Sequence, residues 1–440
     1  MEYLSTNKIG IIDLATSKIT DQELDEDLVK EKISGAGVTM ALYEQYKDED
    51  PIVLGTGLLT GTLVPASALG VITAKSPLTG KVCHAPITLY AGMELKYSGF
   101  DYIVIKGNSP KPVYLWIHDG VADINDAKEV WGKDVWTSTD TVRDVMGDQL
   151  IQVLTIGKAG ESESDFAQVC INYWASGDRW GFGKLFGQKR LKLAALRGMS
   201  LLEVSDAEGF VKQCKELLAV VKKGPFTDKK GIEEIPVAIG EEDIRKWLAP
   251  LVHGHQSCFN TPYSTNTFVF LDEDPNLLKE SEKKEPGFLI TDVYGLLGFK
   301  KLGLSAAEAC ALLRECARYG IDAVAVSELN QKAGRKKPDE IKKSFSGLKG
   351  TLENIGKGRF SPWSPPKPIF ANFGLPADGS QDAQWWERRQ AVAYIFGIHP
   401  IFALMSPELS EEKLIELANL GTGLGLASGT LDKVIADISK

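Results

Sequence analysis

The sequence predicts an α+β protein, with a β-rich N-terminal domain over residues 1–205 and a mostly helical region over residues 206–440. The chain has 440 residues, of which 43 % are hydrophobic and 25 % charged, close to globular averages of roughly 45–50 % and 25 %. In the first part, short aliphatic and β-branched runs alternate with Gly, Pro, Asn and Asp, as in sheets with short connections. After Leu202 the apolar residues recur at helical spacing instead.

Four runs in the N-terminal domain predict strands: Ile9–Leu14, Pro51–Leu59, Tyr102–Lys106 and Val113–Ile117. The turn residues Gly107-Asn-Ser-Pro110 separate the last two runs, which predicts that these two strands form a hairpin. Helical periodicity interrupts the strands at Glu23–Lys32 and Ser138–Met146.

The C-terminal region carries clearer helix signals. Residues Asp206–Val221 have apolar side chains at helical spacing, and Ser305 with Glu308 forms a capping box that opens a helix ending at Gly320. A helix over Glu411–Leu420 should stop at Gly421, and a last helix should follow Ser428. Residues 327–358 mix acidic and basic side chains, typical of a solvated linker or exposed helix, and residues 361–368 predict a proline-rich loop.

Charge and composition exclude several classes of protein. The net charge is −9 with scattered basic residues, so no nucleic-acid surface is expected. The longest apolar runs, Phe268–Leu271 and Ala391–Phe396, are far shorter than the ~20 residues of a membrane span. Six dispersed cysteines without a CxxC pair, and the absence of a secretory signal at the N-terminus, favour a reduced, cytoplasmic protein.

Three stretches of the first half, taken together, resemble the tungsten-pterin aldehyde:ferredoxin oxidoreductase family. In order along the chain they are Gly55–Thr62 with Lys75–Gly80, then Gly92–Asp101 with Ile105–Gly107 and Lys111–Trp116, then Ile156–Glu161 with Arg179–Gly183 and Gly187–Lys192. The resemblance covers residues 1–200 well and the rest weakly. It implies a two-sheet base on which two molybdopterins lie, with shortened helical domains that close over it and supply a four-iron cluster.

The resemblance assigns a remnant pterin site to Arg179, Gly181, Gly183 and Asp322. Several residues that contact the pterins in the family differ in this chain. Leu69 stands in place of an arginine, Trp180 in place of a glycine and Tyr394 in place of an aspartate. Ala317 stands in place of the first carboxylate of the family pattern that ends at Asp322. An alternative explanation of the surviving glycines is that turns and tight packing require them without any ligand.

At the family's cluster positions, Cys258 occupies the first, Thr261 and Thr265 the second and third, and His399 the fourth. Because four thiolates normally hold such a cluster, the resemblance predicts that no conventional cluster forms. The spacing His253-x-His255-x2-Cys258 is compatible with zinc, with His399 as a fourth ligand. The alternative is an exposed turn with two solvated histidines.

The family's catalytic glutamate aligns with Leu289, so the sequence predicts no catalytic residue. We expect Leu69, Trp180, Leu289 and Tyr394 to be buried and to fill the space of the lost pterins, because large voids sacrifice packing contacts.

Three functions remain open. The leading hypothesis is a non-catalytic or altered-function paralogue without cofactor, acting as a structural or regulatory subunit beside a protein partner or in a redox complex. The first alternative is an active enzyme with a tungsten- or molybdenum-bis-molybdopterin and a four-iron cluster, oxidising aldehydes to acids with ferredoxin. The second is a small-molecule binding module that uses the vacated pterin cleft.

Overall fold

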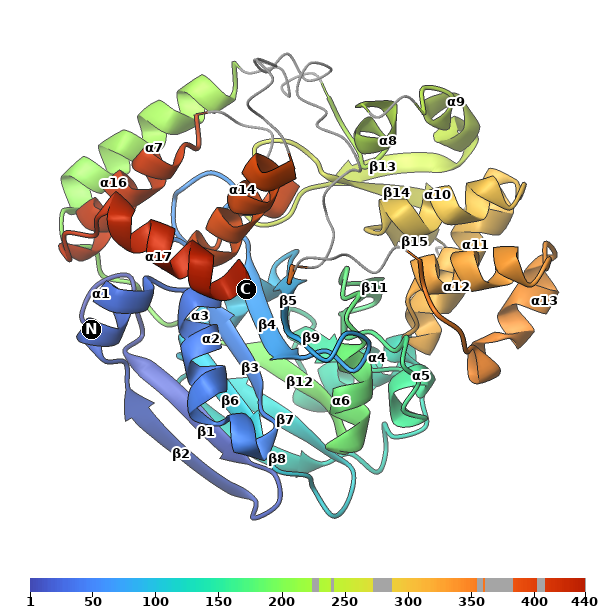
Figure 1. The fold of residues 1–440 in the computed structure, drawn as a ribbon, viewed down its shortest axis with the longest axis horizontal. Coiled ribbons are helices and arrows are strands. Elements are labelled where there is room, and N and C mark those ends of the chain that lie inside the picture. The colour runs from blue at the N-terminus through green and yellow to red at the C-terminus, as the bar shows by residue number, and fades with distance from the viewer. Residues whose placement is uncertain are drawn as a thin grey trace.

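The computed structural model describes residues 1–223, 229–238, 241–271, 287–353, 359–360, 383–401 and 408–439. Two sheets form a base, and two groups of helices lie on either side above it (Figure 1). The predicted loop over residues 361–368 lies outside the described residues. No described helix has the length and apolar character needed to cross a membrane.

The first sheet of the base has the strand order β2-β1-β6-β3-β4-β5. Strands β1 and β6 run parallel, and all other neighbours in this sheet are antiparallel. The strands are β1 Lys8–Asp13, β2 Lys18–Glu23, β3 Ile52–Thr56, β4 Gly70–Lys75, β5 Val82–Ile87 and β6 Tyr102–Lys106.

The second sheet has the order β11-β10-β9-β12-β7-β8. Its strands are β7 Val113–His118, β8 Val121–Asp126, β9 Gln152–Thr155, β10 Cys170–Ile171, β11 Trp174–Ala175 and β12 Leu191–Arg197. The expected hairpin between Tyr102–Lys106 and Val113–Ile117 is therefore wrong, because β6 and β7 belong to different sheets. The hairpin partner of β7 is β8, joined by Asp119 and Gly120 with φ of 46° and 79°, the left-handed pair that a tight hairpin turn requires.

Six α-helices connect the strands of the base: α1 Glu26–Lys32, α2 Ala36–Gln45, α3 Ala91–Tyr97, α4 Val135–Met146, α5 Lys158–Glu161 and α6 Phe182–Gln188, with a 3₁₀ turn η1 at Lys47–Glu49. The expected helices at Glu23–Lys32 and Ser138–Met146 are thus present with shifted starts. In each, an aspartate caps the first turn: Asp25 accepts from the Asp27 N–H, and Asp134 from the Thr137 N–H.

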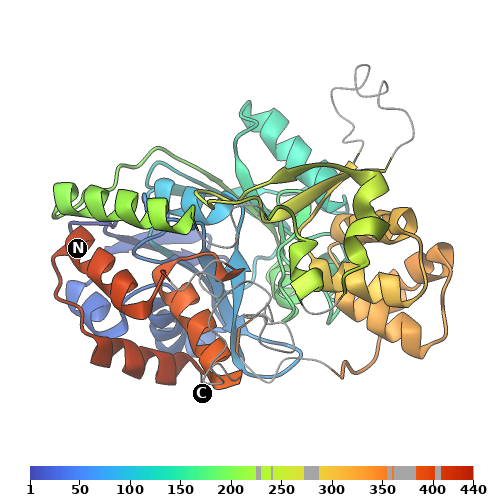
Figure 2. The ribbon, with the colours of Figure 1, turned by 90° about the horizontal axis from the view of Figure 1, so that it is seen from above.

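One helical group combines the start and the end of the C-terminal region (Figure 2). It contains α7 Ala207–Val221, α14 Ala383–Phe396, α16 Glu411–Thr422 and α17 Ser428–Ser439. The end of α14 is fixed to the base, because the Ser34 hydroxyl donates to the Ile395 carbonyl at 2.6 Å. Helix α16 ends at Gly423 rather than at the expected Gly421. Gly423 adopts φ of 74°, whereas Gly421 lies against Leu4 where a Cβ would come within 2.2 Å.

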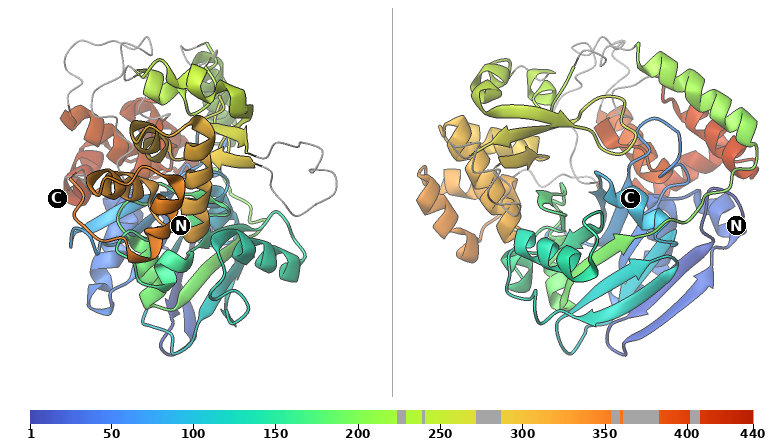
Figure 3. Two further views of the ribbon diagram at one scale, coloured as in Figure 1. Left: turned by 90° about the vertical axis from the view of Figure 1, so that its right-hand side faces the viewer. Right: turned by 180° about the vertical axis from the view of Figure 1, so that it is seen from behind.

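The other group holds α8 Glu234–Ala238, α9 Ile244–Leu248, α10 Val293–Lys301, α11 Ala306–Tyr319, α12 Ala323–Lys332 and α13 Pro338–Lys343, with 3₁₀ turns η2 Ala249–Leu251 and η4 Phe345–Gly347. It also contains a small sheet of β13 Val252–Gln256, β14 Asn266–Phe270 and β15 Gly287–Ile290, which helical periodicity did not predict. The predicted capping box of Ser305 and Glu308 and the stop at Gly320 are confirmed. Figure 3 shows both groups above the base from two further sides.

The α10–α13 group is joined to the base by backbone hydrogen bonds. The Gln168 N–H donates to the Gly320 carbonyl and the Asp322 N–H donates to the Phe166 carbonyl, both at 2.9 Å. Gly157 allows this close approach, since a Cβ there would lie 2.4 Å from the Tyr319 carbonyl oxygen. These contacts bring Asp322 to the loop that carries Arg179.

Candidate functional site

Arg179 lies between two buried carboxylates that come from the helical group containing α10 and α12. One guanidinium nitrogen donates to Asp292 Oδ1 at 2.6 Å, and the other donates to Asp322 Oδ1. Each carboxylate also caps a helix: Asp292 accepts from the Gly295 N–H at the start of α10, and Asp322 from the Val324 N–H at the start of α12. Only 12 % of the Arg179 side chain is exposed, against 4 % and 6 % for the two aspartates. We call these three residues the Arg179 clamp.

The clamp holds one cation between two carboxylates. Burial alone would lower the pKa of Arg179, but the attraction of Asp292 and Asp322 raises it. Burial raises the pKa of Asp322, and the guanidinium of Arg179 opposes that rise. Since Arg179 already has a carboxylate on each side, a phosphate that reached its remaining N–H groups would lie close to two buried carboxylates, and like charges oppose that contact.

Asp178, the neighbour of Arg179, is a buried titratable group that sequence reasoning missed. It accepts hydrogen bonds from the backbone N–H groups of Val169 at 3.1 Å and Trp180 at 2.9 Å. Burial raises the pKa of Asp178 to about 7, and the backbone N–H groups oppose this rise. Its position beside Arg179 was visible in the sequence, but nothing there indicated that it would be buried.

The two remnant-site glycines are required by packing. Gly181 has φ of 76°, and a Cβ on it would lie 2.5 Å from the Asp165 carbonyl oxygen. A Cβ on Gly183 would lie 2.7 Å from the backbone of Ala167 and Gln168. Both positions therefore need glycine whether or not a ligand binds, which agrees with the alternative explanation from the sequence.

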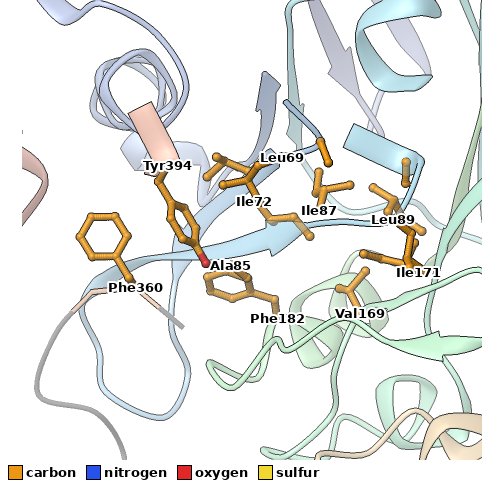
Figure 4. Packing of buried hydrophobic residues seen from close by; sticks show 14 of the residues in the cluster. Leu69, Ile72, Ala85, Ile87, Leu89, Val169, Ile171, Phe182, Phe360 and Tyr394 are labelled. Atoms are coloured by element: carbon orange, nitrogen blue, oxygen red, sulfur yellow. The ribbon is translucent and has the colours of Figure 1, made fainter. Parts of the chain in front are cut away.

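The expected burial of the four large replacements is confirmed: Leu69, Trp180, Leu289 and Tyr394 are each 0 % exposed. In Figure 4 the ring of Tyr394 points toward Ala85 and Phe182. The Tyr394 ring also packs edge-on against Phe360, with centroids 5.0 Å apart. The indole N–H of Trp180 donates to the His84 carbonyl at 3.0 Å.

The residues around Arg179 do not fit a phosphate-bearing pterin. The guanidinium is held by two carboxylates, and the side chains at the replaced positions are uncharged, aliphatic or aromatic, and fully buried. Leu289, at the position of the family's acid, lies in β15 and is buried as well.

The segments of Cys258 and His399 meet at Ala66. The Ala66 N–H donates to the Asn260 carbonyl at 2.8 Å, and the His399 N–H donates to the Ala66 carbonyl at 2.7 Å. The hydroxyl of Thr261 donates to the Cys258 carbonyl at 2.8 Å, a local backbone hydrogen bond of the kind that threonine makes in turns. Thr265 Oγ1 and Asn266 Nδ2 lie 3.8 and 3.6 Å from Cys258 Sγ.

These surroundings favour uncharged side chains. Burial raises the pKa of the Cys258 thiol, and burial lowers the pKa of His399 to about 4. In the parts of the chain that the structure describes, no group of three or more His, Cys, Asp and Glu side chains is placed to hold a metal ion.

The two histidines of the proposed zinc spacing have separate partners. The ring of His253 stacks on Phe270 with centroids 3.9 Å apart, and His255 Nε2 lies 3.3 Å from Glu233 Oε1. The pairing of β13 with β14 shifts between Val252 and Gly254, so His253 falls at an irregularity of the strand. A zinc ion bound by Cys258, His399 and these histidines stays a prediction.

Replacing Cys258 by serine tests that prediction. Without a metal, we expect the free energy of unfolding in urea to change by no more than about 1 kcal/mol, because the two side chains are nearly isosteric. The replacement of Cys310, another buried cysteine, by serine provides the matched control. Release of one zinc per chain, with a clear fall in melting temperature for Cys258→Ser alone, would show that the site holds zinc.

Comparison with known proteins agrees with the geometry of the base. Residues 9–198 match the family described as "Aldehyde ferredoxin oxidoreductase, N-terminal domain". The tungsten-containing aldehyde ferredoxin oxidoreductase of Pyrococcus abyssi is 35% identical over 226 residues, covering 50% of this chain and 37% of the relative. The enzyme of the same description from Pyrococcus furiosus is 33% identical over 224 residues, covering 49% and 37%.

A more distant relative is the "Aliphatic sulfonate oxidoreductase, WOR-like subunit" of Pyrococcus furiosus, 29% identical over 230 residues and covering 47% of this chain and 36% of the relative. The matches thus span little more than a third of these relatives' length.

A solved structure, the active site complex BamBC of benzoyl coenzyme A reductase with 1,5-dienoyl-CoA, matches 99% of this chain and 88% of its own chain. The TM-score is 0.78 at 17% identity, so the likeness concerns the fold. The sequence matches and the two-sheet base agree that residues 9–198 belong to the aldehyde ferredoxin oxidoreductase family, as its N-terminal domain.

Proposed function

We propose that this chain is a non-catalytic or altered-function member of the family that acts as a structural or regulatory subunit. In this proposal residues 1–205 are the base domain and residues 206–440 are shortened helical domains. The observation that carries it is the Arg179 clamp: the cation that would meet a pterin phosphate instead joins the base to α10 and α12.

The clamp supports this proposal through its energetics. A buried arginine held between two carboxylates is costly to take apart, because removing it from one partner leaves an uncompensated buried charge. The same contacts fix the first turns of α10 and α12. Arg179 thus has a structural task that does not depend on any cofactor.

The former cluster positions support the same proposal. Of four thiolates only Cys258 remains, and it is surrounded by hydroxyl and amide groups. The relatives' descriptions add that one is a "WOR-like subunit" and that the solved structure is an "active site complex". We infer that this chain also works beside a protein partner in a redox complex. All six cysteines are free and buried, consistent with a cytoplasmic location.

Metal and pterin analysis tests the proposal directly. We expect the anaerobically purified full chain to contain tungsten, molybdenum and iron far below one atom per chain, and no pterin fluorescence after oxidative release. A tungsten-containing relative, produced in the same cells and loaded with metal, is the control for cofactor supply.

Stoichiometric tungsten or molybdenum with pterin, together with about four irons per chain, would contradict this proposal. That result would support the alternative of an active enzyme that oxidises aldehydes to acids with ferredoxin. Aldehyde-dependent reduction of a viologen dye would then measure that activity.

A further inference from the structure

Several large apolar side chains of the base are exposed. Five of them, from four separate segments, are well exposed: Leu63 (57%), Tyr90 (39%), Val121 (51%), Met199 (80%) and Leu201 (89%). Scattered single apolar residues are normal on a surface, but a contiguous apolar patch marks an interaction site. Whether these five form one patch depends on how their segments meet.

Hydrogen bonds bring three of these segments to the C-terminal end of α3. The Tyr97 hydroxyl donates to the Gly61 carbonyl at 2.6 Å, two residues before Leu63. The Ser200 N–H, between Met199 and Leu201, donates to the Tyr97 carbonyl at 2.9 Å. The Gly120 N–H, directly before Val121, donates to the Ser98 carbonyl at 2.6 Å.

Helix α3 itself completes the patch. Tyr90 precedes its first turn, and Met93 and Tyr97 are half-buried while their neighbours in the helix are buried. Tyr90, Met93 and Tyr97 are spaced three and four residues apart, so they share one side of the helix. We call this patch the α3 face; its members are Leu63, Tyr90, Met93, Tyr97, Val121, Met199 and Leu201.

A hollow of about 730 Å³ opens beside the α3 face, and Gly99, Gly120, Ser200 and Leu201 contribute to its lining. Because Gly120 and Leu201 adjoin or belong to the α3 face, the hollow and the apolar patch form one continuous surface. A surface that is both hollowed and apolar is a better site for a protein contact than a flat, polar surface would be.

The hollow carries two exposed carboxylates and two ammonium groups. Its lining includes Glu2, Glu203, Lys8 and Met1, whose N-terminal ammonium donates to Asn7 Oδ1 within the protein. Lys8 is engaged elsewhere: its ammonium lies 2.9 Å from Asp21 and donates to the Gly120 carbonyl. Glu2 and Glu203 are exposed and form no ion pair within the described residues. Both carboxylates raise the pKa of Tyr3, Glu2 more strongly, so their fields act on the same region.

We propose that the α3 face is the docking surface for a different protein, one whose contact region has an apolar centre and lysine or arginine at its edge. A second copy of this chain suits it less well. A two-fold contact places the same patch on both sides. Lys8, the one lysine or arginine in the lining of the hollow, is already paired with Asp21, so a copy would bring carboxylates but no free side-chain cation. The inference rests on the proposed function as a subunit and names the surface that the partner uses.

A defined probe tests the surface without knowledge of the partner. The probe is a fluorescently labelled amphipathic helix built only of leucine and lysine, and binding to the full chain is followed by anisotropy. We expect saturable binding that weakens at high salt, and no binding by the matched leucine–glutamate helix. The double variant Met199→Ser/Leu201→Ser should weaken binding about tenfold or more, or about 1.4 kcal/mol. Glu2→Gln/Glu203→Gln should remove most of the salt dependence.

The matched control is Val220→Ser/Glu216→Gln, which changes an exposed valine and an exposed glutamate at the far end of α7. It should bind the probe like the unchanged chain. Equal binding by all variants, or by both helices, would overturn the proposal. Analytical ultracentrifugation gives a further test. A dimer of the unchanged chain that becomes a monomer in Met199→Ser/Leu201→Ser would also overturn the proposal, because the occupant of the α3 face would then be a second copy. None of these readouts depends on metal or pterin content, so failure here is distinguishable from failure of the proposed function.

Discussion

Replacing Arg179 by methionine should destabilise the protein by about 3–5 kcal/mol, the cost of leaving buried carboxylates without their counter-ion. Asp292 and Asp322 would both lose a charged hydrogen bond inside the junction between the base and the helices. The measurement is the free energy of unfolding from urea titrations near neutral pH. Because the same carboxylates cap α10 and α12, amide exchange in the first turns of these helices should also become faster.

The controls separate loss of the clamp from loss of any arginine. Arg190 is exposed and donates to the Pro110 carbonyl, so Arg190→Met should change stability by no more than about 0.5 kcal/mol. The triple variant Arg179→Met/Asp292→Asn/Asp322→Asn should recover part of the loss, since it removes the unpaired charges. A loss for Arg179→Met as small as that for Arg190→Met would show that the clamp contributes little to stability.

Replacing Asp178 by asparagine should change how stability depends on pH. Burial holds the folded-state pKa of Asp178 at about 7, above the ~3.9 of an unfolded chain. Between these values the folded state binds a proton that the unfolded state does not. The contribution of Asp178 to stability is therefore fully present at low pH and is lost as pH rises toward 7.

The stability of Asp178→Asn relative to the unchanged chain should increase by roughly 2–3 kcal/mol between pH 5 and pH 8, at about 1.4 kcal/mol per pH unit up to pH 7. The difference between the two proteins isolates Asp178. Burial also lowers the pKa of His84 to about 3 and that of His399 to about 4, and these groups add stability as pH rises. Urea titrations at several pH values provide the measurement, and the exposed Asp144→Asn is the control. A difference that does not vary with pH would contradict the assignment.

Much of the local structure could be predicted from the sequence. The capping box at Ser305 and the stop at Gly320 lie where expected, because both signals act within one or two turns of the chain. The hairpin between Tyr102–Lys106 and Val113–Ile117 was wrong for the opposite reason. Strand periodicity identifies each strand, but it does not tell which sheet the strand joins, and the Asp119-Gly120 turn was the stronger hairpin signal.

Some features of the candidate site could also be predicted from the sequence, and others could not. Once the family resemblance was recognised, the sequence showed that Thr261 and Thr265 replace cysteines and that Leu289 replaces a glutamate. Such replacements are visible in the sequence because they change which chemical groups the chain carries. The pairing of Arg179 could not, because its partners lie 113 and 143 residues away. The sequence by itself determined the fold class and the absence of thiolates at three of the four former cluster positions. Only the tertiary structure decided that the arginine of the remnant site is paired with two carboxylates and that Asp178 is buried, because charge pairing and desolvation arise only when distant segments exclude water together.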